Sequence, residues 1–196
     1  TYQWKTGSTD MTLSGVPAGN YSVTITDPNS GCVQVQNPVL TNPTVLSIAS
    51  SGTDVSCAGA NDGTASVTVA GGVMPYYYAW SNGATTSSLS GIAGGIYGGT
   101  VTDSNGCIIT DSVNIAEPTP LALNVSGTDV TCAGQADGSV NASGSGGTGN
   151  YTYLWSNGAT SANLAKLAGG TYSVTVTDGN GCTANTSKSL KEPEAM

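Results

Sequence analysis

Histidine and arginine are absent from the sequence, and its four lysines face twelve acidic residues, for a formal net charge of −8. Proteins that bind nucleic-acid phosphates or anionic membrane surfaces need clustered cations, so we expect neither partner. The absence of histidine removes the most frequent general base of enzymes, and serine occurs only in repetitive polar contexts. The sequence therefore predicts that the chain is not an enzyme.

Charged residues of either sign and long apolar runs are also scarce. Charged residues make up 8% of the chain, against about a quarter in typical soluble domains. No apolar run approaches the roughly 18 residues of a membrane-spanning helix, and no charged-then-apolar signal segment opens the chain. The chain opens instead on the strand-like Tyr2-Gln3-Trp4, so we expect a piece of a longer polypeptide.

Small polar residues and strand formers are abundant. The chain contains 51 serines and threonines and 28 glycines, which take over the role of charge in keeping it soluble. Threonine, valine and tyrosine outweigh the strong helix formers, and this balance favours strands.

A repeat of 75 residues organises the chain. Four pairs of identical residues are separated by this distance: Cys57 and Cys132, Trp80 and Trp155, Tyr97 and Tyr172, and Cys107 and Cys182. Residues 45–119 align with 120–194 without a gap, with about half of the positions identical. Residues 1–44 match the second half of the same unit. We therefore predict the C-terminal part of a repeat at 1–44, a full repeat at 45–119 and a full repeat at 120–196.

Each full repeat consists of short alternating segments separated by turn residues. In the third repeat, Tyr172, Val174 and Val176 alternate with hydroxyl residues, as expected of a strand with one buried face. A tryptophan falls in the third strand, and a tyrosine shortly after a glycine resembles the tyrosine corner of immunoglobulin domains. Seven or so strands in about 75 residues predict an all-β fold of tandem immunoglobulin-like β-sandwich repeats. So small a domain buries a modest core, and covalent support would help it.

The order of motifs within each full repeat is distinctive. It comprises Asp-Val-(Ser/Thr)-Cys-Ala-Gly, Asp-Gly, Gly-Gly, Tyr-x-Tyr-x-Trp-Ser-Asn-Gly, Leu, Gly-Gly-x-Tyr, Thr-Val-Thr-Asp-x-Asn-Gly-Cys and Glu-Pro. This order resembles the SprB-type repeat of very large surface adhesins of gliding bacteria, over essentially the whole chain. The resemblance implies export by the type 9 secretion route, an extracellular location on the bacterial cell surface, and a role in adhesion, gliding motility or a surface filament.

Five cysteines at two fixed places per unit indicate disulfides formed in an oxidising compartment. No Cys-x-x-Cys is present, so a zinc site is not expected. One pairing stays within repeats, Cys57–Cys107 and Cys132–Cys182, and leaves Cys32 to another partner.

A sandwich favours a different pairing. Cys57 follows the first strand, whereas Cys107 opens the last strand from the opposite end, roughly 30 Å away. Disulfide-bonded Cα atoms must lie within about 7 Å. Because the bottom of one repeat adjoins the top of the next, we favour Cys57–Cys182, with Cys107 and Cys132 paired to repeats outside this chain. The pairing within repeats stays open as the alternative.

Two kinds of ligand site deserve testing. Tyr76, Tyr77, Tyr78 and Trp80 offer an aromatic platform for sugars, but strand alternation places all except Tyr77 in the core. Asp62, Asp103, Asp137 and Asp178 lie in turns and offer oxygens to calcium, although such turns use aspartate for their own hydrogen bonds. We expect no cofactor and keep calcium as the alternative.

Glycosylation is the modification that the sequence favours. Five asparagines fit Asn-x-Ser/Thr, namely Asn20, Asn124, Asn141, Asn150 and Asn185. Asp111-Ser112-Val113 resembles the Asp-Ser/Thr-apolar O-glycosylation motif of the bacteria that carry these adhesins, which makes Ser112 the principal candidate.

Two functions remain after these exclusions. In the first, the repeats build an extended stalk or filament, and their partners are neighbouring repeats or identical chains. In the second, each repeat binds surface glycans weakly and the array gains strength by multivalency. Since the sequence offers few outward-facing aromatic residues, we favour the first.

Overall fold

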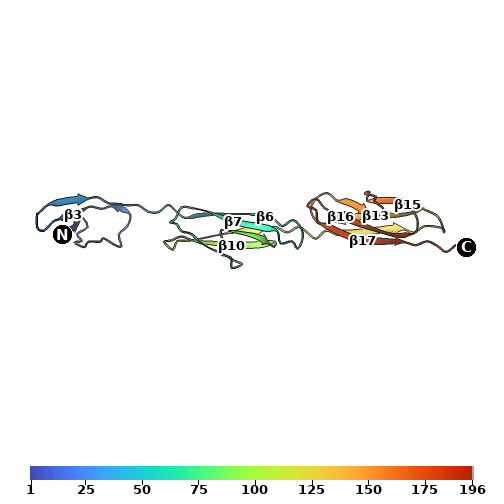
Figure 1. The fold of residues 1–196 in the computed structure, drawn as a ribbon, viewed down its shortest axis with the longest axis horizontal. Coiled ribbons are helices and arrows are strands. Elements are labelled where there is room, and N and C mark those ends of the chain that lie inside the picture. Colours follow the sequence, from blue (N-terminus) through green and yellow to red (C-terminus); the bar gives the residue numbers. More distant parts are fainter. Residues whose placement is uncertain (196) are drawn as a thin grey trace.

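The computed structural model describes residues 1–195, and the chain forms a rod of three units in line, with its termini towards opposite ends (Figure 1). All regular secondary structure in this range is β-strand. No helix among these residues is long and apolar enough to cross a membrane.

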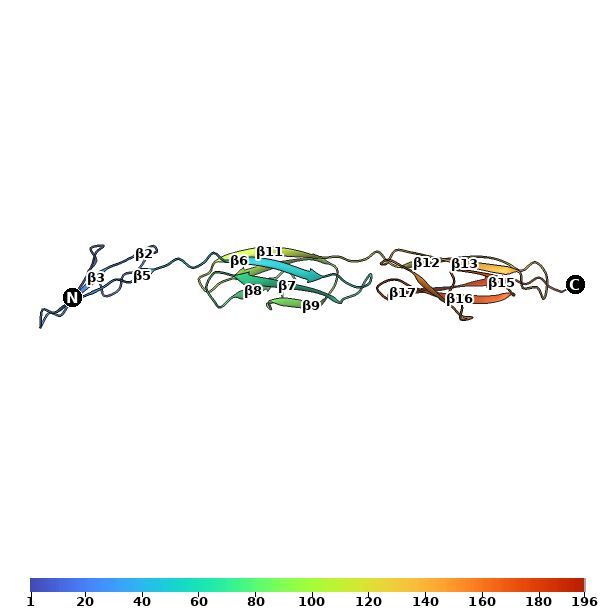
Figure 2. The ribbon, with the colours of Figure 1, turned by 90° about the horizontal axis from the view of Figure 1, so that it is seen from above.

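Residues 45–119 form a two-layer sandwich. Its strands are β6 (Ser47–Thr53), β7 (Gly63–Ala70), β8 (Tyr77–Trp80), β9 (Ser88–Ile92), β10 (Gly95–Thr102) and β11 (Ile108–Ile115). One antiparallel sheet has the order β6-β7-β9 and the other has the order β11-β10-β8. β6 also lies beside β11, where the two sheets meet (Figure 2). This division of strands confirms the predicted immunoglobulin-like fold.

Residues 120–194 repeat the same topology. The strands are β12 (Ala122–Thr128), β13 (Gly138–Ser145), β14 (Thr152–Trp155), β15 (Asn163–Leu167), β16 (Gly170–Thr177) and β17 (Thr183–Leu190). β12, β13 and β15 form one sheet, and β14, β16 and β17 form the other. Side chains on β16 alternate as the sequence predicts, because Val174 and Val176 are buried while Ser173 is exposed.

Residues 1–44 contain only the second half of this arrangement. The strands are β1 (Tyr2–Trp4), β2 (Gly19–Asn20), β3 (Val23–Thr26), β4 (Val33–Gln36) and β5 (Val39–Leu40). The sheet β1-β3-β4 corresponds to β8-β10-β11, and within these residues no counterpart of β6 and β7 covers it. Leu40 is consequently 44% exposed, whereas its equivalent Ile115 is 1% exposed.

Each full repeat has six strands, so the expected number of seven or so was too high. The turn after Trp80 is tight, since the Gly83 N–H donates to the Trp80 carbonyl at 2.9 Å and the Trp80 N–H donates to the Ala84 carbonyl at 2.8 Å. The chain then crosses directly to β9 in the other sheet. No length of chain is left between β8 and β9 for a further strand.

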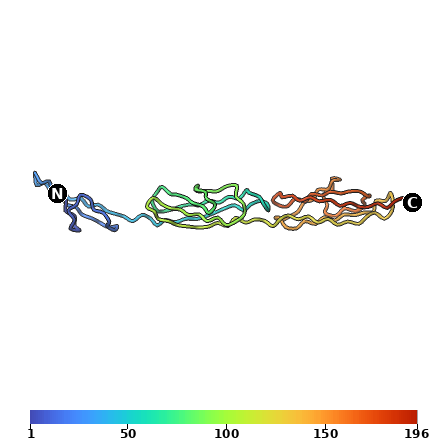
Figure 3. The backbone as a smooth tube through the Cα atoms, turned by 90° about the horizontal axis from the view of Figure 1, so that it is seen from below, coloured from blue at the N-terminus to red at the C-terminus, as the bar shows by residue number. Residues whose placement is uncertain are grey.

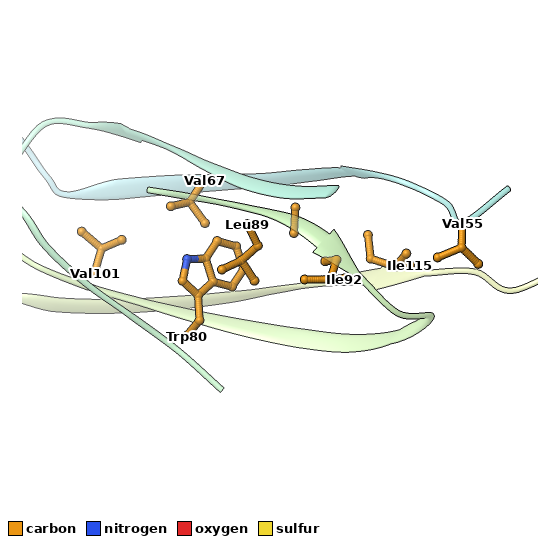
Figure 4. Close-up of a cluster of buried hydrophobic side chains, with 8 residues drawn as sticks. Val55, Val67, Trp80, Leu89, Ile92, Val101 and Ile115 are labelled. Carbon is orange, nitrogen blue, oxygen red and sulfur yellow. The ribbon is translucent and has the colours of Figure 1, made fainter. Parts of the chain in front are cut away.

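The core of residues 45–119 lies between the two sheets and is centred on Trp80 (Figure 4). Its buried members are Val55, Ala65, Val67, Trp80, Leu89, Ile92, Val101 and Ile115. The indole N–H of Trp80 donates to the Thr86 carbonyl at 2.8 Å, so the ring is buried without losing its hydrogen bond. Burying each large apolar side chain stabilises the fold by about 1.5–3 kcal/mol.

A tyrosine corner is present in every unit. The hydroxyl groups of Tyr21, Tyr97 and Tyr172 donate to the carbonyls of Pro17, Ala93 and Ala168, at 2.5, 3.0 and 3.0 Å. This bond to a carbonyl four residues upstream is the feature that the glycine–tyrosine spacing predicts. It fixes the crossing of the chain into β3, β10 and β16.

Candidate functional site

The junction between the two full repeats is the best-defined candidate site. We use the term junction loop for residues 54–62, which follow β6, and junction hairpin for residues 178–182, which join β16 to β17. Figure 3 shows these ends of the two repeats facing one another. The structure joins them by a disulfide between Cys57 and Cys182, whose Cα atoms are 5.8 Å apart. Both cysteines are half-buried.

Three carboxylates hold the junction loop in shape. Asp62 accepts the backbone N–H of Ser56 at 3.0 Å, and Glu117 accepts that of Gly59 at 2.6 Å. Asp54 accepts the N–H of Ala116 at 2.8 Å, so the loop is tied at Asp54 and at Gly59 to the segment that follows β11. Hydrogen bonds from Ser56 also lower the pKa of Asp62, because they stabilise its ionised form.

A single buried aspartate organises the junction hairpin. Asp178 is 6% exposed and accepts the N–H groups of Asn180 and Cys182, each at 2.9 Å. Its other oxygen accepts the N–H of Thr148 at 2.8 Å, from the loop between β13 and β14. The bond from Thr148 is the main cause of the lowered pKa of Asp178, and burial opposes it. Cys182 therefore projects from a rigid turn.

A hydrogen bond supplements the disulfide across the junction. The side-chain amide of Asn180 donates to the Ser56 carbonyl at 3.0 Å, from hairpin to loop. The same amide lies 3.3 Å from the hydroxyl of Thr148, within its own repeat. A covalent bond and an oriented amide together restrict both the separation and the rotation of the two repeats.

The same two elements recur without a partner. In the loop of residues 129–137, Asp137 accepts the N–H of Thr131 at 3.0 Å and Glu192 accepts that of Gly134 at 2.6 Å. In the hairpin of residues 103–107, Asp103 accepts the N–H groups of Asn105 and Cys107, each at 2.9 Å.

The remaining cysteines lie in these unpartnered elements or in the half repeat. In the part of the chain that the structure describes, Cys107, Cys132 and Cys32 are exposed and unbonded. The bond present in the structure is thus the one between repeats, and neither pairing within a repeat is formed.

The three tyrosines at the start of β8, Tyr76 just before it and Tyr77 and Tyr78 within it, divide as strand alternation predicts. Tyr76 and Tyr78 pack against the core, and the Tyr76 hydroxyl donates to the Gly71 carbonyl at 2.5 Å. Tyr77 is 62% exposed, and its counterpart in the next repeat is Thr152. The structure therefore presents one outward tyrosine and no aromatic cluster on this strand.

The four turn aspartates are occupied by backbone hydrogen bonds. Asp62 and Asp137 hold junction-type loops, and Asp103 and Asp178 hold hairpins. Among residues 1–195, no three histidine, cysteine, aspartate or glutamate side chains gather closely enough to hold a metal ion.

All candidate glycosylation residues lie on the surface. The exposed set comprises Asn20, Asn124, Asn141, Asn150, Asn185 and Ser112. Ser112 lies on β11, and its backbone N–H donates to Asp111 at 2.8 Å. Asp111 also accepts the N–H of Ser50 at 3.0 Å, which ties β11 to β6.

Several junction residues were missed by the sequence reasoning. The motif order contains Asn180, within Asp-x-Asn-Gly-Cys, and Glu117, within Glu-Pro, but it predicts no junction contact for either. A signal was present, because Asp54, Glu117 and Asn105 all recur unchanged 75 residues later. Apolar periodicity cannot reveal such residues, since their partners are backbone groups far away in the sequence.

Comparisons with solved structures find low similarity to several multidomain proteins. The N-terminal eight Ig domains of Down Syndrome Cell Adhesion Molecule (DSCAM) isoform 1.30.30 match with 15% identity and a TM-score of 0.41, over 89% of this chain and 27% of that one. A C-terminal 282-residue fragment of intimin, in complex with the translocated intimin receptor's intimin-binding domain, matches with 14% identity and a TM-score of 0.32, over 87% of this chain and 57% of that one. The chain therefore spans about a quarter of the first structure and over half of the second. No curated protein matches.

The comparison with family models agrees with the order of motifs in the sequence. The model described as SprB repeat matches residues 49–85 and 124–160, which are equivalent stretches 75 residues apart. Each stretch runs from the first strand, through the junction-type loop with its cysteine, to the turn after the core tryptophan. The SprB repeat model thus matches once within each full repeat of the chain.

Proposed function

We propose that these repeats form an extended stalk of a bacterial surface adhesin or filament, outside the cell. The observation that carries this proposal is the junction, where one repeat holds the next by the Cys57–Cys182 disulfide and by Asn180. Domains that move independently of one another need only a flexible linker between them. A loop and a hairpin that are both held rigid by carboxylates are instead suited to fixing the direction of the array.

The unpartnered loop and hairpin extend the proposal to further repeats. The Cys132 loop has the same hydrogen bonds as the Cys57 loop, and the Cys107 hairpin has the same hydrogen bonds as the Cys182 hairpin. We propose that Cys132 and Cys107 form the same bond with repeats on either side, and that Cys32 does so as the hairpin cysteine of its unit.

A peptide map without reduction, on protein taken from the native cell surface, tests the pairing. We expect a peptide pair linked through Cys57 and Cys182, with Cys107 and Cys132 linked to other repeats. A Cys57–Cys107 pair would instead indicate independent modules and would contradict the stiffened stalk.

The same material tests glycosylation. We propose that Ser112 carries an O-glycan, since it is exposed on β11 within Asp111-Ser112-Val113. Intact mass before and after chemical deglycosylation, with a Ser112→Ala variant as control, measures this. A Ser112 peptide of unmodified mass in the native protein would contradict it, and the five asparagine sites are scored in the same spectra.

The alternative function, weak binding of glycans by each repeat, rests on the exposure of Tyr77. A glycan array probed with the full chain separates the two functions. Reproducible binding that is lost in Tyr77→Ala but kept in the matched Thr152→Ala variant would overturn a purely structural stalk. Absence of binding in all three proteins favours the stalk.

A further inference from the structure

The disulfide has a consequence for how the array carries tension. Cys57 and Cys182 are 125 residues apart in sequence, yet their Cα atoms are 5.8 Å apart. Residues 58–181 therefore form a loop that is closed at its base by a covalent bond. This loop includes the strands from β7 to β16, which is most of two folded repeats.

The strands at the base of this loop lead in and out along the rod. β6 enters the junction shortly before Cys57, and β17 leaves it directly after Cys182. In Figure 1 the arrows of β6 and β17 both run along the long axis towards the C-terminus. A straight covalent route therefore passes through β6, the disulfide and β17.

We infer that the Cys57–Cys182 bond is a load-bearing link, which carries pulling force past the two repeats so that their cores are not stretched. The inference deepens the proposed stalk and rests on its pairing of cysteines. Strands in the direct route are already extended, so tension gains almost no length by unfolding them. Residues in the closed loop gain none, because the bond holds both ends together.

The position of the bond distinguishes it from a disulfide buried inside one domain. A disulfide in a domain core meets the force only after the domain has unfolded. Here the bond lies between folded domains, and both cysteines are half-buried, so a small thiol can reach them. Tension and a reductant therefore act on the same bond while both repeats remain folded.

Single-molecule pulling on the full chain, held by peptide tags at both termini, tests this inference. Serine replaces Cys32, Cys107 and Cys132, so that no other thiols interfere. At constant force without reductant, we expect no lengthening step from residues 58–181. Dithiothreitol returns two thiols to the protein as it closes to its own cyclic disulfide. Its addition should then release a contour length of about 410–440 Å, the extended length of 125 residues less their 5.8 Å separation.

The force dependence of reduction is the decisive readout. A load-bearing bond should be reduced faster as the force rises, with no lengthening before the reduction event. A rate independent of force, or lengthening from these repeats before reduction, would overturn the inference if the linked Cys57–Cys182 peptide is verified in the same sample. The Cys57→Ser/Cys182→Ser variant is the control, and both its repeats should unfold under force without reductant.

The unsubstituted chain separates this result from a failure of the stalk proposal. If the cysteines pair within repeats, reduction should release two shorter lengths of about 160–175 Å, each the extended length of 50 residues less the separation of the bonded Cα atoms. That pattern would contradict the proposed pairing itself. If the cysteines pair as Cys57–Cys182 but reduction of the bond does not depend on force, the stalk proposal stands. Only the inference that the disulfide carries the pulling force is then overturned.

Discussion

Residues 45–119 and 120–194 share their hairpin turns and junction elements but fill their cores differently. In the first repeat, Val67 of β7 faces Gly99 of β10, and a Cβ atom on Gly99 would lie 3.2 Å from the Val67 side chain. In the second repeat the equivalent residues are Ala142 and Val174, both buried. The branched side chain has moved from one sheet to the other.

This exchange separates two kinds of constraint. A core position needs its share of space filled, and either sheet can supply the atoms. A junction position needs one particular side chain, because Asp62 and Glu117 each accept a defined N–H group. The two repeats therefore differ at core positions, where either sheet can fill the space. They agree at junction positions, where a particular side chain must accept a particular N–H group.

Removing the core tryptophan should have the largest effect on stability, and the loss of stability should be the same in both repeats. We expect Trp80→Ala and Trp155→Ala each to destabilise their own repeat by about 3–5 kcal/mol, since each leaves a large cavity and an unpaired carbonyl. Hydrogen exchange followed by mass spectrometry resolves the two repeats in one molecule. Loss of protection in the unaltered repeat would contradict separate cores.

The pair of core residues found in the second repeat should also fit the core of the first repeat. We expect Gly99→Val alone to destabilise residues 45–119 by about 1–3 kcal/mol through overpacking against Val67 and Trp80. Adding Val67→Ala should recover most of the loss, because it recreates the pair found in the second repeat. Urea unfolding measures both variants.

Gly98→Val is the matched control for this exchange. It lies on the same strand, and a Cβ atom at Gly98 would meet nothing within 4 Å. We expect little change in stability from it. Failure of Val67→Ala to rescue Gly99→Val would show that the two repeats differ by more than this swap.

The hairpin aspartates should give both repeats the same response to acid. The pKa of Asp103 is lowered because, although burial opposes it, N–H groups of Cys107, Val73 and Asn105 hold the ionised form, and the pKa of Asp178 is lowered similarly. The stabilisation they provide is full above the ordinary aspartate value of about 3.9 and is lost as pH falls through the lower folded value.

Thermal unfolding between pH 7 and pH 2 measures this acid response. We expect a falling midpoint below about pH 4. Asp178→Asn should be less stable at pH 7 and should show a shallower fall in the unfolding of residues 120–194. An unchanged slope in that variant would mean that Asp178 does not contribute to the acid response.

The tyrosine corners should show the smallest effect. Tyr97→Phe and Tyr172→Phe each remove one hydroxyl bond of 3.0 Å, and we expect a loss of about 0.5–1.5 kcal/mol in either repeat. Urea unfolding of the two single variants checks the equality. A clearly larger loss in one repeat would show that the corner has a further role there.

The local sequence pattern was sufficient to predict the strands. It was insufficient to predict the long-range hydrogen bonds that hold strands and loops together. Alternation predicted that Val174 and Val176 are buried, and the glycine–tyrosine spacing predicted the bond of Tyr97 to Ala93. The role of Asp178 as a buried acceptor was not predicted, because its partner Thr148 lies 30 residues away on another loop. Its sequence neighbours indicate only a turn.

The number of strands shows the same limit. Sequence spacing suggested seven or so, but the indole bond of Trp80 to Thr86 and the turn after it send the chain straight to the opposite sheet. The path of a connection depends on where the next strand must lie in three dimensions. Turn residues alone do not contain that information.

The junction is asymmetric, because a loop at the end of one repeat receives a hairpin at the start of the next. A contact of this head-to-tail kind, repeated unchanged, applies the same rotation and the same advance at every step and so generates a screw axis. A surface position such as that of Ser112 would then recur along a helical path around the rod. One loop and one hairpin would thus set both the handedness of the fibre and the spacing of whatever it displays.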